Sequence, residues 1–562
     1  MFFSFILIIF SLILFLFGTV GYGRLLHSLL FKNINNSNFG EYGLLGLIFI
    51  SLVSTSIHFF FNLSENINLL VYLSGLFFAY NYKLEIQIFL KKNKNIMSLL
   101  FITSFFMVIY HKPNEDFGYY HLPYLINIVS EKVIFGLANI QTNQGWNSIW
   151  LNLTGTYNIP IIEMRAVHLT NAIFFVFLSL AILEPIINFK DENKNNNHNH
   201  IKYLIELFCS LFFLYFVLKF SRLGKYGFDV PSNFMAIYCF YLVLKFFSLD
   251  PNLNHIKNNV FQKILIFSLF SILIKLSNLL ILLLPAFIFF QKDIKFFSRS
   301  LIFVIFFTTI WMIQQFIYTG CFLFPLLPSC FDVSWFDTNP ALDLLNHTKG
   351  INKSFAQYQG GLSELEYSKN FNWVSTWFNR NKVEMLEHLL TFIIIFFILF
   401  FFLLKKKNTQ GINFSLKNLY LILLSVTFFQ ILFWLNSSPV IRFGFHYILL
   451  FLFFLLSLIF NKFLLKNFNY KYIIILIYVG LALNMQKNLF RVYDDVIKGN
   501  TFFYTYPNIF FKNEYVSDKK ININYLMKDH SIYCWDTPSL CLAGNQNLAI
   551  NRVNGYLFIS VK

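Results

Sequence analysis

Long runs of apolar residues, separated by short polar stretches, recur along most of the chain. A helix that crosses a bilayer needs about 20 predominantly apolar residues, and shorter runs imply tilt or partial burial. The runs predict spans near 2–21, 42–61, 67–81, 97–111, 166–187, 203–220, 233–248, 263–275, 277–290, 300–317, 385–404, 418–435, 445–460 and 472–485. The pattern therefore predicts an all-α polytopic membrane protein with about 13–14 transmembrane helices. Around Lys275-Leu276-Ser277 two arrangements are open, one long kinked helix or two short ones.

The composition supports a membrane protein. Of the 562 residues, 57% are hydrophobic and only 13% are charged, which is more apolar surface than a soluble fold can cover. The net charge of +17 does not indicate a nucleic-acid partner, because the lysines lie in short loops between apolar runs. They indicate topology and contact with membrane lipid. Residues 1–21 lack a basic first segment, so we expect a retained span and not a cleaved signal peptide.

The basic residues divide unevenly between alternate loops, which predicts the orientation. One set of loops holds 21 Lys and Arg residues, whereas the other set holds 11 over a greater length. The richer set comprises 22–41, 82–96, 188–202, 249–263, 291–299, 405–417 and 462–471. Because basic loops stay in the cytoplasm, we expect loops 113–165 and 318–383 and both termini on the periplasmic side of a bacterial cytoplasmic membrane. The same count favours two short helices around Lys275, since a single span would invert everything downstream.

Residues 486–562 differ from the apolar segment 1–485. Short apolar runs alternate there with polar residues and turn formers, which predicts a small, partly β extracytoplasmic domain. Cys321 and Cys330 share one predicted outer loop, and Cys534 and Cys541 lie in this terminal domain. Two pairs on the oxidising side predict two disulfides. Cys209 and Cys239 fall in spans and are expected in the core, and no cysteine or histidine spacing indicates a metal site.

A dense group of polar residues follows the fourth apolar run, in the stretch 112–124. It holds the adjacent carboxylates Glu115 and Asp116, then Tyr119, Tyr120 and His121. Carboxylates at a membrane surface are costly to desolvate, so either they form a solvated turn or they have a function. If the segment is helical, Asp116 and Tyr120 share a face. The tyrosines either line a site or anchor the interface, and His121 either assists proton transfer or is structural.

Other ionisable residues lie in predicted outer turns. They are Arg442 beside Pro439, Lys275 at the tip between two short helices, and Arg222, Lys225 and Asp229 in a second charged loop. Arg442 can hold a phosphate or extend to ordinary lipid head groups. Asp229 is either a second acid or a helix N-cap before Pro231. Apolar positions from Leu122 to Ile134 suit an amphipathic helix in the interface or, equally, a core stripe beneath the outer loops.

Several motifs together resemble the type-C (GT-C) membrane glycosyltransferases, in an uncharacterised bacterial branch. They are Asp116 with Tyr119-Tyr120-His121-Leu122-Pro123, Gly136-Leu-Ala-Asn-Ile, Gly145-Trp-Asn-Ser, Lys275-Leu-Ser, Trp311 to Pro325, and Phe433-Trp434 with Pro439 and Arg442-Phe443. The resemblance covers most of residues 95–460 and keeps the order and sidedness of the motifs. Four predicted spans precede the acidic motif here, whereas the usual family pattern has one.

The resemblance implies an inverting enzyme that moves a sugar from a polyprenyl-phosphate donor to an extracytoplasmic glycan, lipid or protein. Asp116 is then the expected general base, with Glu115 second and His121 assisting. Arg442 and Lys275 are expected at the donor phosphate, and Tyr119, Tyr120, Arg222, Lys225 and Asp229 near the substrates. The residues indicate no cofactor and no divalent metal. The alternative is a transporter or flippase of a lipid-linked glycan, which needs ionisable groups near the midplane, where the sequence places few.

Overall fold

The computed structural model describes most of the chain. The described residues are 2–31, 38–109, 116–187, 199–224, 227–250, 253–291, 299–354, 364–403, 414–460, 470–497, 515–518, 523–526, 534–535, 537–542 and 548–561. Within them, 11 helices are long and apolar enough to cross a membrane. The protein is therefore an all-α, multi-pass membrane protein with little β structure, as the sequence predicts.

The spanning helices follow the apolar runs closely. They are α1 (Phe2–Leu30), α2 (Phe39–His58), α7 (Thr170–Ile187), α8 (Asn199–Lys219), α9 (Asp229–Ser248), α10 (Asn254–Ile274), α12 (Arg299–Thr319), α15 (Val374–Leu403), α16 (Phe414–Ser437), α17 (Ile441–Ile459) and α18 (Tyr470–Ile497). The remaining three predicted runs also lie on helices. These are α3 (Glu65–Asn81), α4 (Lys83–Ile109), and the 3-10 turn η7 (Leu276–Leu282) followed by α11 (Leu283–Gln291).

The break at Lys275 separates two helices. α10 ends at Ile274, Lys275 is extended with φ −155° and ψ 118°, and η7 begins at the next residue. The prediction of two helices at this point is confirmed. The helix α4 is also interrupted, because Asn93 has a non-helical backbone with φ −116° and ψ 18°.

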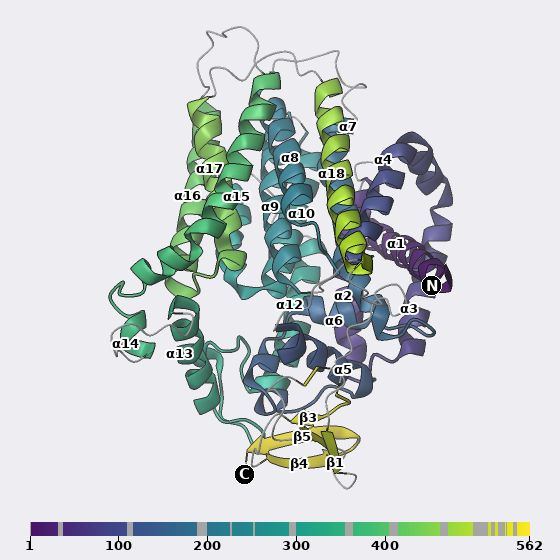
Figure 1. Cartoon of the computed structure of the whole chain (residues 1–562), viewed down its shortest axis with the longest axis vertical. Coiled ribbons are helices and arrows are strands. Elements are labelled where there is room, and N and C mark those ends of the chain that lie inside the picture. The colour runs from purple at the N-terminus through teal and green to yellow at the C-terminus, as the bar shows by residue number, and fades with distance from the viewer. Residues whose placement is uncertain are drawn as a thin grey trace.

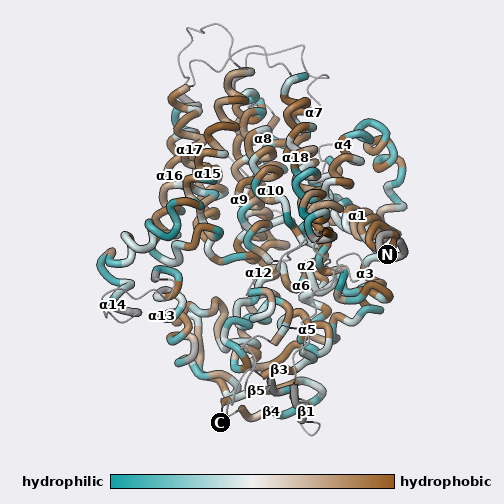
Figure 2. The backbone as a smooth tube through the Cα atoms, in the orientation of Figure 1, coloured by the Kyte–Doolittle hydropathy of each residue, from teal (hydrophilic) through white to brown (hydrophobic). Residues whose placement is uncertain are grey.

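The helices and the predicted outer segments occupy different parts of the molecule (Figure 1). Helices α8, α9, α10, α15, α16, α17 and α18 run roughly parallel, and α1, α3 and α4 lie to one side. The short helices α5 (Leu122–Ser130), α6 (Ile149–Gly155), α13 (Asn339–Ser354) and α14 (Glu364–Ser368) gather with the strands at the opposite end. Figure 2 shows that the parallel helices are mainly hydrophobic and that the gathered end is mixed. Loops 113–165 and 318–383 thus share one end of the molecule.

The segment after the acidic motif is part of the core and not a helix on the membrane surface. Leu122, Leu125 and Ile128 of α5 are at most 3% exposed, and Trp150 of α6 is fully buried. Val133 and Ile134 are buried as well. Of the two interpretations of this apolar stripe, the core stripe is the correct one, because α5 and α6 pack beneath the outer segments.

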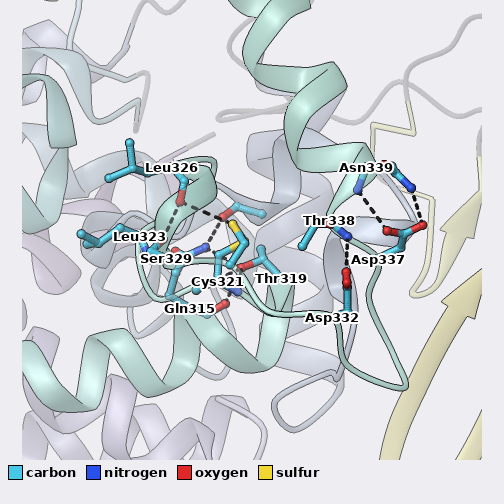
Figure 3. Close-up of a disulfide and its surroundings, with 12 residues drawn as sticks. Gln315, Thr319, Cys321, Leu323, Leu326, Ser329, Asp332, Asp337, Thr338 and Asn339 are labelled. Carbon is cyan, nitrogen blue, oxygen red and sulfur yellow. Dashed lines mark hydrogen bonds between the residues drawn. A yellow bond between two sulfur atoms is a disulfide. The ribbon is translucent and has the colours of Figure 1, made fainter.

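The loop after α12 is held by a disulfide between Cys321 and Cys330 (Figure 3). Ser329 donates to the Leu326 carbonyl at 2.7 Å, and its hydroxyl accepts from the Leu323 N–H at 3.0 Å. A second disulfide joins Cys534 to Cys541, while Cys209 and Cys239 are buried free thiols. All four cysteine predictions are confirmed.

The C-terminal region contains the strands that the sequence predicts. They are β1 (Tyr515–Asp518), β2 (Ile523–Leu526), β3 (Cys541–Leu542), β4 (Leu548–Val553) and β5 (Tyr556–Val561). β2 pairs antiparallel with β1 and parallel with β3, and β4 and β5 form an antiparallel hairpin. The helix α18 continues to Ile497, beyond the predicted domain boundary at residue 485. Phe135 exchanges two 2.9 Å backbone hydrogen bonds with β5, which attaches the C-terminal region to loop 113–165.

Candidate active site

Four charged side chains from distant parts of the sequence form a connected chain of ion pairs. Arg442 Nη2 lies 2.5 Å from Asp116 Oδ2, and Arg442 Nε lies 3.3 Å from Asp229 Oδ2. The other oxygen of Asp229 contacts the Lys275 ammonium. The order along this chain is therefore Asp116, Arg442, Asp229 and Lys275. Two carboxylates and two cations share one partly exposed place, because the Asp116 and Asp229 side chains are 27% and 26% exposed and Arg442 is 45% exposed.

Each of the four residues lies at the end of a helix or beside one. Asp116 precedes the π-helical turn η2 (Phe117–His121), and Asp229 is the first residue of α9. Lys275 lies between α10 and η7, and Arg442 is the second residue of α17. A cation at a helix N-terminus is unfavourable on its own, so the two carboxylates stabilise Arg442 there. The N-cap interpretation of Asp229 is wrong, because Phe228 is the N-cap and Asp229 contacts two cations.

A buried amide fixes the helices that carry these residues. Asn278 of η7 donates to the hydroxyls of Ser232 and Ser271, each at 2.8 Å, and accepts from the Tyr447 hydroxyl at 2.8 Å. These contacts join η7 to α9, α10 and α17. Asn233 adds a 2.8 Å hydrogen bond to the backbone carbonyl of Arg442. Buried hydrogen bonds that join several helices in this way rigidify a site.

Lys275 is enclosed by aromatic rings. Its ammonium lies 3.0 Å from the centroid of the Phe443 ring and 5.7 Å from that of Phe228. The Lys275 side chain is 11% exposed, so it is a largely desolvated cation held by Asp229 and two ring faces. In the sequence, Phe443 follows Arg442 and Phe228 precedes Asp229.

The turn η2 places Tyr120 and His121 behind the ion pairs. Both are buried, and the His121 ring packs against Tyr120 at 4.3 Å and Phe228 at 5.3 Å. Burial lowers the pKa of His121 to about 4, so the imidazole is neutral at pH 7. Burial, aided by the charges of Asp116 and Asp229, raises the pKa of Tyr120. A π-helical turn is rare and frequently marks a functional site.

The other predicted site residues stand apart from the ion pairs or outside the described residues. Glu115 and Lys225 lie outside the described residues. Tyr119 is half-buried, with its ring packed edge-on to Tyr120 at 6.3 Å. Within the described part of the chain, no hydrogen bond or ion pair joins Arg222 to Asp116, Asp229 or Arg442. Its neighbour Ser221 instead contacts Asn488 and Arg491 of α18, at 2.8 and 2.9 Å.

The C-terminal region contacts the acidic motif, which was not predicted from the sequence. The backbone N–H of Trp535 donates to the Gly118 carbonyl at 3.0 Å, and the Trp535 ring lies 6.1 Å from that of Phe117. A Cβ added at Gly118 would lie 2.3 Å from the indole, so only glycine fits there. Trp535 is next to the disulfide cysteine Cys534, which was the sole signal in the sequence. Trp535 thus holds η2 from outside.

We expect Trp535→Ala to lower any activity that depends on Asp116 by about 10- to 100-fold, because small misplacements of a catalytic group are costly. Phe558→Ala is the matched control. Phe558 stacks on Phe135 at 4.2 Å and joins the same C-terminal region to loop 113–165 without contacting η2. Activity and thermal stability of both variants are to be measured. An equal loss of activity in both would show that Trp535 has no specific effect on η2.

The described residues hold no group of three or more His, Cys, Asp and Glu side chains arranged to bind a metal ion. Asp116 and Asp229 are the two carboxylates that converge at the site, and both are directed at Arg442. The arrangement provides a carboxylate that can accept a proton and a guanidinium that can hold a phosphate bidentately.

Comparison with known proteins identifies a family. Residues 5–449 match the family described as Domain of unknown function (DUF8201). The chain belongs to this family. The match includes Asp116, Asp229, Lys275 and Arg442, and it ends inside α17. No curated protein and no solved structure matches the chain significantly.

Proposed function

We propose that the protein is an inverting membrane glycosyltransferase of the GT-C type, which transfers a sugar from a polyprenyl-phosphate donor. The observation that carries the proposal is the convergence of Asp116 and Asp229 on Arg442, with Lys275 attached through Asp229. The four residues come from four segments of the chain and meet at one partly exposed place, and three of them, Asp116, Lys275 and Arg442, belong to the motifs of the resemblance. A site for sugar transfer from a lipid phosphate needs this combination of a base and cations.

In the proposed reaction the donor phosphate binds at Arg442, near the positive N-terminal end of α17. The phosphate competes with Asp116 for the guanidinium and so releases the carboxylate. Asp116 then accepts the proton of the acceptor hydroxyl while that oxygen attacks the anomeric carbon. The bond between the sugar and the phosphate breaks, and Arg442 stabilises the negative charge on the departing polyprenyl phosphate. Asp229 holds Arg442 in place, and Lys275 holds the phosphate as a second cation.

A lipid-linked glycan transporter is the competing function, and one observation bears on it. Glu41 of α2 and Lys263 of α10 form an ion pair, with 2% and 4% of their side chains exposed. Charged groups buried inside spanning helices are a feature of transporters. However, the two groups neutralise each other in direct contact, and Glu41 lies in the first turn of α2 and not at its middle. The site around Arg442 therefore carries the proposal.

The test is sugar transfer by the purified full chain in proteoliposomes with polyprenyl-phosphate sugars as donors. We propose that Asp116 and both termini face the periplasm, so a membrane-impermeant acceptor should be glycosylated only where that face is accessible. Right-side-out and inverted vesicles give this comparison. Movement of the intact donor across the bilayer without release of polyprenyl phosphate would instead identify a flippase.

A further inference from the structure

A cavity of about 470 Å³ lies between α1, the start of α2, the end of α3 and the first half of α4, and Glu184 of α7, which pairs with Lys245, completes its wall. Its wall includes Arg24, Asn38, Tyr42, Tyr82, Ile88 and Asn93. None of the residues of the Asp116 site lines it. The wall is close-packed, because a Cβ added at Gly21 would lie 2.0 Å from the Gly75 carbonyl oxygen. The cavity is therefore a preformed feature of the N-terminal helices.

Arg24 is a buried cation in the wall of this cavity, and one of its nitrogens has no hydrogen-bond partner among the described residues. The residue is 2% exposed, and its Nε and Nη2 donate to the Glu85 carboxylate at 3.0 and 2.9 Å. The guanidinium lies over the rings of Tyr82 and Tyr42, at 4.7 and 5.3 Å. Nη1 is buried and has no hydrogen-bond partner among the described residues. A buried charged donor without an acceptor is costly, so an acceptor at Nη1 would be strongly favoured.

Two asparagines of the cavity wall also have unused polar atoms. Asn38 Nδ2 and Asn93 Oδ1 are buried without hydrogen-bond partners among the described residues. Asn93 is the residue at which α4 is kinked, so the kink places this amide in the wall. Arg24, Asn38 and Asn93 all line the cavity, so a rotation of these side chains would bring two donors, which match phosphate oxygens, and one acceptor, which matches a hydroxyl group, to a molecule bound there.

Exposed apolar side chains, with lysines near them in the sequence, lie on the helices α3 and α4 that form part of the cavity wall. Leu84 and Ile88, one turn apart on α4, are 69% and 68% exposed, and Phe77 of α3 is 63% exposed. The segment 82–94 also carries Lys83, Lys91, Lys92 and Lys94, all exposed, and a single acid, Glu85. Figure 2 shows hydrophilic residues at the bend of α4. Apolar side chains with several lysines are typical of segments that contact anionic lipid.

We propose that this cavity binds the head group of an anionic phospholipid with a hydroxylated head group, such as phosphatidylglycerol. Arg24 Nη1 and Asn38 Nδ2 donate to the phosphate, and Asn93 Oδ1 accepts from the head-group hydroxyl. The acyl chains lie along Leu84, Ile88 and Phe77. This lipid site is independent of the proposed sugar transfer.

The experiment compares lipid retention by the full chain in nanodiscs that contain equal parts of phosphatidylglycerol and phosphatidylcholine. Native mass spectrometry after extraction counts the lipids that stay bound. Arg24→Lys keeps the charge beside Glu85 but lacks Nη1, and Ile86→Trp fills the cavity without altering the ion pair. Each should lower retention of phosphatidylglycerol by about tenfold, the effect of losing one charge-assisted hydrogen bond or the space for the head group. Lys91→Ala removes a neighbouring charge outside the cavity wall and should retain the lipid.

Three results would overturn the proposal. One is equal retention of phosphatidylglycerol by Ile86→Trp and by the wild-type chain. This comparison remains valid even if Arg24→Lys does not fold. Another is equal retention of phosphatidylcholine and phosphatidylglycerol by the wild-type chain. The third is thermal stabilisation of the wild-type chain by glycerol 1-phosphate that equals the stabilisation by phosphatidylglycerol. This result would assign the cavity to a soluble phosphate ester.

Discussion

Replacement of Asp116 with asparagine is expected to lower the rate of sugar transfer by about 10²–10⁴-fold, the contribution of a positioned general base. Asparagine keeps the shape of the side chain and still offers an oxygen to Arg442, but it does not accept the proton of the acceptor hydroxyl. Because Arg442 also contacts Asp229, the guanidinium stays in place in the variant. Its affinity for the donor phosphate should therefore be retained or increased. The loss should appear in kcat, with the KM for the donor unchanged or lower.

Asp343→Asn is the matched control, since Asp343 is an exposed acid of α13 in the loop 318–383. It should transfer sugar at the wild-type rate. Near-normal transfer by Asp116→Asn, at normal abundance and stability, would remove Asp116 from the proposed role. Asp229 would then be the carboxylate to test next at the same guanidinium, followed by Glu115.

The fold was largely predictable because the membrane imposes its own pattern on the sequence. Every predicted apolar run lies on a helix, since a lipid-exposed backbone has no partner other than itself. The break at Lys275 was predictable from the alternation of basic loops, because a single span there would invert everything downstream. The location of the stripe from Leu122 to Ile134 was not predictable, because an amphipathic stripe has the same sequence pattern whether lipid or protein covers it. Only the packing of α5 and α6 shows that protein does.

The site was predictable residue by residue but not as an arrangement. Asp116, Asp229, Lys275 and Arg442 were each identified from local chemistry, yet each also had a structural interpretation. What the sequence does not contain is their mutual distance, which depends on Asn278 and the helices that it joins. Arg222 had the same local signals as Arg442, and nothing in its loop indicates that its neighbour contacts α18. Trp535 lay outside the motifs altogether, because its role depends on contact with Gly118 across more than 400 residues.

The ion pairs suggest why Arg442 is central to the proposed mechanism. Without a donor, the guanidinium is shared between Asp116 and Asp229, and Asp229 is shared between Arg442 and Lys275. A phosphate that binds Arg442 replaces one carboxylate as its anionic partner, so donor binding and release of the base are the same event. In the proposed mechanism, Asp116 is therefore released from Arg442 only when the donor is bound, and it is then available as the base for the acceptor hydroxyl.

Arg442→Ala should therefore impair two steps at once. Removal of the guanidinium takes away the cation at the donor phosphate and leaves Asp116 and Asp229 without their shared partner. We expect the KM for the donor to rise and kcat to fall, with a combined loss in kcat/KM of about 10²–10³-fold or more. Arg442→Lys should recover part of kcat but less of the donor affinity, because an ammonium does not form the bidentate contact with a phosphate.

The control is Arg380→Ala, since Arg380 is an exposed arginine near the start of α15, and it should behave as wild type. The double variant Asp116→Asn/Arg442→Ala decides whether the two residues act together. If donor binding at Arg442 releases Asp116, the double variant should lose little more activity than the worse single variant, because the two losses are not additive for groups that act as a unit. Fully additive losses would contradict the coupling, and a kcat loss in Arg442→Ala with an unchanged donor KM would place the donor phosphate elsewhere.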